Sequence, residues 1–248
     1  MTHDDLKLDE QAISKAAEIG LSSQLDEAEK IDVDVKTDLV KAVQGQVDSV
    51  AIAGQGLVIQ KDIRVQEMEL HTDSIDINPL SALFGQIELN QSVDATARLV
   101  LTEQDINRAL NSDYMLSKLQ KLELNVEGKT VVIEPQQLEL HLPDDGKMVF
   151  NAKAILHDEI GKTKSIGFAA TILVKTGAQS LLMEGFNCSP NQGISLELAI
   201  TFMQKIKELV NLPYIELETM VLRVKDVDVQ KGSLTLHSEA HVSQLPTS

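Results

Sequence analysis

Residues 148–174 read MVFNAKAILHDEIGKTKSIGFAATILV and hold two long runs in which apolar and polar side chains alternate. The apolar positions are Met148, Phe150, Ala152, Ala154 and Leu156 in the first run, and Ile166, Phe168, Ala170, Ile172 and Val174 in the second. Because successive side chains of a strand point to opposite faces, each run predicts a strand with one apolar face. The turn signal at 159–161 joins them into a predicted antiparallel hairpin.

The same alternation recurs along most of the chain. It predicts further strands around residues 31–35, 63–70, 75–77, 122–126, 138–142, 220–224 and 234–236. Glycine-containing turn signals at 127–128, 143–146 and 231–232 separate several of them. Since no linker rich in proline, glycine or serine interrupts the pattern, we expect one continuous domain over residues 10–243. Residues 1–9 are expected to be frayed or disordered, and 244–248 to form a tail.

Three segments carry helical periodicity instead. The first spans residues 8–25, with an apolar face made by Leu8, Ala12, Ile13, Ala16, Ala17 and Ile19. The second begins at Thr102, where a threonine followed three residues later by an acid is a helix N-terminal signature, and it breaks near Asn111-Ser112. The third spans about 195–211 and stops before Pro213.

Strands with one apolar face need a cover, which the predicted helices can provide. The pattern therefore predicts an α+β, mostly β fold: a long, twisted antiparallel sheet wrapped around one or more helices. The small side chains of Ala152, Ala154 and Ala170 lie between larger ones on the apolar face. They either admit a helix closely or leave a groove, and the sequence leaves both outcomes open.

Composition and charge exclude several classes of partner and location. The net charge is −16, which excludes nucleic acid as a partner and strong attraction to anionic membranes. Cys188 is the single cysteine, so no intramolecular disulfide can form. Met1 is followed by Thr-His-Asp-Asp rather than a basic and then apolar segment, and no stretch reaches about 20 apolar residues. We expect a cytoplasmic protein, peripheral at a membrane at most.

The sequence contains no recognisable catalytic motif. It lacks a Walker A loop, a Gly-x-Ser-x-Gly elbow and a His-Glu-x-x-His helix. His237, Glu239 and His241 would share the outward face of a strand, where two imidazoles and a carboxylate suit a metal. A fourth ligand would have to come from elsewhere, and a solvated strand face is the favoured interpretation. We expect neither a metal nor a cofactor, and no enzyme activity.

Two longer stretches, in order and spacing, resemble a known family. They are Leu39-Val-x-Ala-x-Gln-Gly45-Gln-Val47-Asp-Ser-Val50-x-Ile52-x-Gly54-x-Gly56-Leu57 and Leu101-Thr-Glu-Gln-Asp105-Ile-Asn107-Arg-Ala-Leu110. With the opening helix, the strand at 31–35 and the closing strand pair that ends near Val242, the chain resembles the LmeA-like phospholipid-binding family over most of residues 10–243.

This resemblance implies a fold like that of tubular lipid-binding proteins and binding of a phospholipid or similar diacyl lipid. It also implies a role in membrane or envelope lipid handling, with transient membrane contact, and it offers no catalytic residues to carry over. Family members linked to envelope glycolipid synthesis are exported or membrane-anchored. This chain shows no export signal, which leaves the lipid class open.

Three hypotheses follow for the apolar interior. The first is a lipid carrier, whose predicted lining is Ile63, Val65, Met68, Leu70, Phe150, Phe168, Ile172, Phe202 and Met203. The alternative is a non-enzymatic scaffold or interaction module whose core is filled by its own side chains. An enzyme acting on a bound lipid is the third, and residues of nucleophile and base type are not gathered in a recognisable way.

Overall fold

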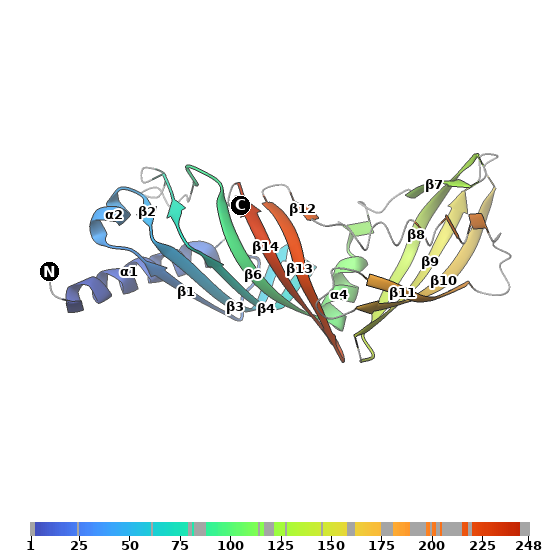
Figure 1. Ribbon diagram of the computed structural model, residues 1–248, viewed down its shortest axis with the longest axis horizontal. Coiled ribbons are helices and arrows are strands. Elements are labelled where there is room, and N and C mark those ends of the chain that lie inside the picture. Colours follow the sequence, from blue (N-terminus) through green and yellow to red (C-terminus); the bar gives the residue numbers. More distant parts are fainter. Residues whose placement is uncertain are drawn as a thin grey trace. The chain divides into compact units, whose positions relative to one another are not determined.

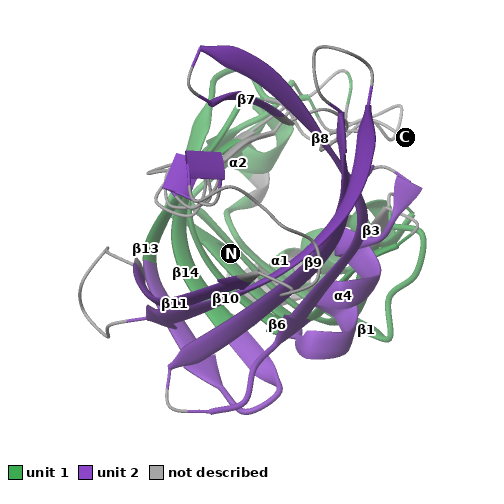
Figure 2. Ribbon diagram, turned by 90° about the vertical axis from the view of Figure 1, so that its right-hand side faces the viewer, with its two compact units in different colours: residues 1–101, 213–225, 235–248 green, residues 102–212, 226–234 purple. Residues whose placement is uncertain are grey.

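The computed structural model confirms a mostly β, antiparallel protein with few, short helices. It describes residues 3–23, 25–60, 62–78, 81, 88–113, 115–116, 122–126, 128–144, 146–157, 162–174, 181–188, 197–198, 200–201, 204, 215–217 and 220–243. By contacts the chain forms two compact units (Figure 2). Unit 1 comprises residues 1–101, 213–225 and 235–248, and unit 2 comprises residues 102–212 and 226–234.

Unit 1 holds most of a seven-stranded antiparallel sheet (Figure 1). Its strand order is β1 (Lys30–Lys36), β3 (Ser49–Gln60), β4 (Ile63–Thr72), β6 (Val93–Thr102), β14 (Ser233–Val242), β13 (Met220–Gln230) and β12 (Ile215–Leu217). A two-stranded ribbon of β2 (Gln46–Val47) and β5 (Ile75–Asp76) accompanies it, and the short helix α2 (Leu39–Val43) follows β1. On β1 the buried side chains alternate with exposed ones, as the pattern at 31–35 predicts.

Helix α1 (His3–Ser22) covers the apolar face of the unit 1 sheet. Ile13, Ala17 and Leu21, spaced four residues apart, pack against the valines of β1 and β3. The apolar face predicted from the sequence was partly wrong, because Ile19 is 63% exposed and Ala16 also faces outward. In the residues that the structure describes, no helix is long and apolar enough to cross a membrane.

Two glycines let β3 pack tightly. Gly56 has a φ of +59°, in the left-handed region that L side chains rarely adopt, and a Cβ there would lie 2.6 Å from Oε1 of Glu29. A Cβ on Gly54 would lie 2.5 Å from Cδ1 of Leu57, whose side chain is fully buried. In the Gly54-x-Gly56-Leu57 stretch, Gly56 is therefore required for its backbone conformation and Gly54 for the close packing of Leu57.

Gly56→Ala is expected to lower the free energy of unfolding by about 1–2 kcal/mol, the cost of a left-handed non-glycine residue. Urea denaturation measures it. Gly185→Ala is the control, because Gly185 has no positive φ and its added Cβ would lie 3.9 Å from the nearest side-chain atom. Equal effects of the two substitutions would contradict the assignment of strain to Gly56.

Unit 2 is built on a five-stranded antiparallel sheet, ordered β11 (Leu181–Cys188), β10 (Thr163–Val174), β9 (Lys147–His157), β8 (Lys129–His141) and β7 (Leu122–Val126). Its apolar face forms a packed core. Phe168 lies between Phe150 and Phe186, with ring centroids 6.2 Å and 5.9 Å away. Ala152 and Ala154 belong to the same buried cluster as Leu198, which lies in the third predicted helix.

Helix α4 (Glu103–Leu110) shields the edge of β8 beyond the end of β7. The amide of Asn107 both donates to the carbonyl of Leu140 (2.8 Å) and accepts from its N–H (2.7 Å). One turn later, Asn111 makes the same pair of bonds to Leu138. One turn earlier, the Glu103 carboxylate accepts from the N–H of Leu142 (2.7 Å). A row of side chains four residues apart thus replaces a strand, and Thr102 caps the helix as predicted.

Asn107→Ala is expected to destabilise unit 2 by about 2–3 kcal/mol, because it removes two hydrogen bonds and leaves the Leu140 N–H and C=O without partners. Gln104→Ala is the matched control, since Gln104 is exposed on the same helix. Urea denaturation followed by circular dichroism compares the two variants. Similar unfolding midpoints would contradict a structural role for the Asn107 amide.

Candidate functional site

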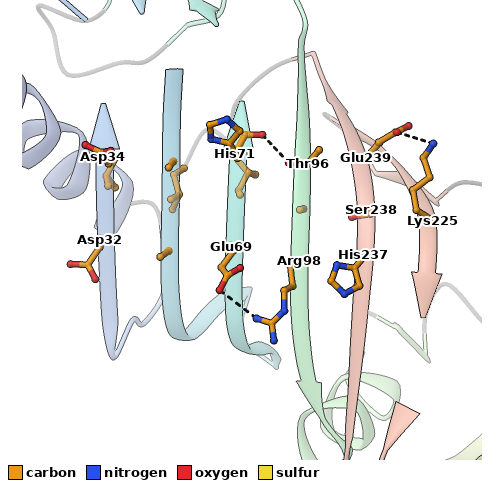
Figure 3. Close-up of a pocket in the computed structure, with 16 residues that line it drawn as sticks. Asp32, Asp34, Glu69, His71, Thr96, Arg98, Lys225, His237, Ser238 and Glu239 are labelled. Carbon is orange, nitrogen blue, oxygen red and sulfur yellow. Dashed lines mark hydrogen bonds and ion pairs between the residues drawn. The ribbon is translucent and has the colours of Figure 1, made fainter. Parts of the chain in front are cut away.

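One face of the unit 1 sheet is polar and forms an open concavity of about 760 Å³ (Figure 3). Polar side chains project from neighbouring strands of the sheet. They are Asp32 and Asp34 on β1, Glu69 and His71 on β4, Thr96 and Arg98 on β6, His237 and Glu239 on β14, and Lys225 on β13. Ala51 and Ala53 on β3 form the floor between β1 and β4.

Most charges on this polar face are neutralised by neighbours. Arg98 lies 3.4 Å from Glu67 and 3.5 Å from Glu69, and Lys225 lies 2.8 Å from Glu239. Lys30 at the start of β1 lies 2.6 Å from Asp32, and its hydrogen bond to that carboxylate raises the pKa of Lys30. Four carboxylates and two cations line the concavity, so the face keeps an excess of negative charge although most of its acids lie beside a cation.

The three candidate metal ligands on β14 do share one exposed face. His237, Glu239 and His241 alternate with the buried Ser238, Ala240 and Val242. Their partners differ, because Glu239 pairs with Lys225 and Nδ1 of His241 lies 2.7 Å from a carboxylate oxygen of Asp94. Within the part of the chain that the structure describes, no group of three or more histidine, cysteine or acidic residues could hold a metal ion.

The opposite, apolar face of the unit 1 sheet forms, with α1, a partly open cavity of about 190 Å³. No polar surface lines it. The lining comprises Ile13, Ala17 and Leu21 from α1, Val33 and Val35 from β1, Val47 from β2, and Val50 and Ile52 from β3. Leu70, Thr72, Ile75, Ile77, Leu89, Val93, Ala95 and Val242 complete it. The Thr72 hydroxyl donates to the carbonyl of Ser74 at 3.4 Å, so it makes its bond locally.

The apolar lining of this cavity offers a water molecule few of the two to four polar partners that it needs, and so favours an apolar occupant. Its volume lies below the roughly 300–1,000 Å³ of small-molecule sites and near that of a cavity that holds one benzene ring. It can hold a segment of an apolar chain. A larger apolar ligand needs α1 to move away from the sheet.

A side-chain hydrogen bond ties α1 to the edge strand. The backbone N–H of Val35 donates to Oγ of Ser14 at 2.9 Å. As the first strand of the sheet, β1 has no strand partner on that side, so this bond satisfies an edge donor as well as fixing the helix. The rest of the attachment is apolar packing of Ile13, Ala17 and Leu21.

The structure divides the predicted lining residues between the two units. Leu70 lines the apolar cavity of unit 1, and Ile63, Val65 and Met68 lie on the same strand, with Val65 buried. Three others belong to unit 2, namely Phe150, Phe168 and Ile172, and the two phenylalanines are in its core cluster. Phe202 and Met203 lie outside the described residues.

Sequence reasoning missed most of the cavity lining. Its members on α1 and β1 were each predicted as apolar faces, at 8–25 and 31–35, so the signal for them was present. What the alternation did not indicate was that these two faces meet, or that Val47, Ile75 and Leu89 close the same space. Periodicity gives the face of an element and not its neighbour.

The comparison with protein families supplies the identification. The model of the LmeA-like phospholipid-binding family matches residues 8–239. The chain belongs to this family. The resemblance predicted from the sequence is therefore confirmed, and the matched range runs from within α1 to within β14, so it covers most of both units. No curated protein and no solved structure matches the chain.

Ser14→Ala is expected to loosen α1 with a cost of about 1 kcal/mol, because it removes the bond to the Val35 N–H. Hydrogen exchange followed by mass spectrometry measures it, as faster exchange in α1 and at Val35. Ser22→Ala is the control, since Ser22 is exposed at the end of the same helix. Unchanged protection in the Ser14 variant would contradict the tethering role.

Proposed function

We propose that this protein binds a phospholipid or similar diacyl lipid without catalysing a reaction, as a carrier in membrane or envelope lipid handling. The acyl chain would enter the apolar cavity between α1 and the unit 1 sheet. The observation that carries the proposal is this wholly apolar cavity in a chain of a phospholipid-binding family. An antiparallel sheet with a helix on its apolar face also agrees with the expected likeness to tubular lipid-binding proteins.

The energetics explain why the cavity must open further. Each methylene costs about 0.8 kcal/mol to remove from an apolar environment, so two acyl tails need on the order of 20 kcal/mol of compensating burial. A cavity of about 190 Å³ can bury only part of that. Lifting α1 would expose the whole apolar face formed by the valines of β1 and β3 and the side chains beside them. The helix would then close over the bound chain.

The predicted lining on unit 2 supports the alternative function for that unit. Phe168 packs with both Phe150 and Phe186, and Ala152, Ala154 and Leu198 belong to the same buried cluster. A packed core of this kind suits a scaffold or interaction module. We therefore propose that unit 1 binds the lipid. Lipid binding by unit 2 is the second candidate.

Native mass spectrometry of detergent-free protein tests the proposal. We expect an added mass of diacyl-lipid size that is lost on denaturation. Ala17→Leu should lower the lipid-bound fraction about tenfold, because the larger side chain displaces about two methylenes from the cavity. Ala16→Leu is the matched control, since Ala16 is the neighbouring residue on the outward side of α1.

Two results would contradict the unit 1 site. A wild-type protein that stays free of added mass after incubation with a membrane lipid extract would favour the scaffold. Equal lipid binding by the two leucine variants would place the lipid elsewhere, and Phe168→Asp would then test unit 2. Thermal unfolding of each variant shows whether the protein stays folded.

A further inference from the structure

Helix α2 lies in a loop, residues 37–47, that leaves the edge of the unit 1 sheet and returns to it. We call this loop the tip. The chain leaves the sheet at Lys36 and returns at Asp48, whose N–H donates to the Lys36 carbonyl at 2.9 Å. Inside this neck the buried Thr37 hydroxyl donates to the carbonyl of Gln46 at 2.8 Å. The carboxylate of Asp38 caps the helix by accepting from the N–H of Lys41. These bonds hold the tip in one conformation.

The tip carries two exposed valines. Val40 is 65% exposed and Val43 is 74% exposed, the highest values among the large apolar side chains in the described part of the chain. Residues three apart in a helix share a face, so the two valines form one small apolar surface. Single exposed apolar side chains are common on protein surfaces and need no explanation. Two neighbouring ones on a hydrogen-bonded, protruding loop are a different case.

The neck of the tip joins the wall of the apolar cavity. The carbonyl of Gly45, which follows α2, accepts from the N–H of Ile77 at 2.8 Å, and Val47 pairs with Ile75. Val47, Ile75 and Ile77 all line the cavity. Figure 1 shows α2 and β2 together at one end of the unit 1 sheet. The exposed valines and the cavity wall are therefore connected through one short, hydrogen-bonded segment.

The charges around the tip indicate what kind of surface it fits. The ammonium of Lys41 lies 2.7 Å from one carboxylate oxygen of Asp48 and 2.9 Å from the other, and this bond raises the pKa of Lys41. The cation on the tip is thus paired, and the whole chain carries a net charge of −16. An anionic surface would repel such a protein, whereas an apolar contact requires no attraction between charges.

We infer that α2 docks the protein onto zwitterionic phospholipid bilayers, with Val40 and Val43 entering the boundary between head groups and acyl chains. The inference rests on the proposed function, because docking at this end brings the cavity wall to the membrane from which a lipid would come. Contact is apolar, so it persists at high salt and weakens as anionic lipid is added.

Flotation with phosphatidylcholine vesicles tests the inference, with the doubly substituted variant Val40→Ser, Val43→Ser. Burial of a valine contributes about a tenfold gain in binding, so we expect the vesicle-bound fraction to fall at least about tenfold in the double variant. Leu182→Ser is the matched control, since Leu182 is also an exposed apolar side chain, 47% exposed, but lies in unit 2. It should float like the wild type.

A separate measurement distinguishes this inference from the lipid-binding proposal. Binding of a monomeric fluorescent fatty acid, delivered without vesicles, should be the same in the wild type and the double variant. Equal flotation of the two proteins, or wild type that does not float, would overturn docking whatever the fatty acid result. So would stronger flotation with vesicles containing phosphatidylglycerol, or light scattering in which only the wild type is dimeric, which would assign the valines to a second copy.

Discussion

An antiparallel sheet with one apolar face must bury that face, and this constraint organises both units of the protein. In unit 2 described side chains bury this face, with Phe168 between Phe150 and Phe186 and a cluster that contains Ala152, Ala154 and Leu198. In unit 1 the cover is helix α1, which contacts the sheet through Ile13, Ala17 and Leu21. A single helix does not fill the space above several strands, so an apolar cavity is left beneath it.

The attachment of α1 to the sheet suits a helix that would have to move away when a lipid carrier takes up its ligand. Among the described residues, α1 contacts the sheet core through apolar side chains and through the Ser14 bond to Val35. An acyl chain offers the same kind of contact, so it can replace the helix side chains without leaving polar groups unpaired. An acyl chain could not replace contacts on the polar face of the sheet in this way, because charged side chains there are paired with one another.

Some elements followed from sequence and others did not, for reasons visible in particular residues. The strand at 122–126 has the bounds predicted, and Thr102 caps its helix as the signature indicates. Strand β8 begins at Lys129 rather than near Leu138, because the ladder tolerates Pro135 at a register irregularity beyond the end of β7. Strands β3, β6 and β11 were missed; in β6 the buried positions Ala95 and Ala97 give a weak apolar signal.

The sequence by itself determined the mostly β class, the alternating faces, the helix start at Thr102 and the family, because these depend on local periodicity and on the order of short motifs. Only the tertiary structure decided that α1 lies over the valines of β1 and β3, that Asn107 pairs with the edge of β8, and that Val40 and Val43 are exposed on a held tip. A side chain's face is set by its neighbours along the chain. Its partner is set by strand order and register, which join residues far apart in the sequence.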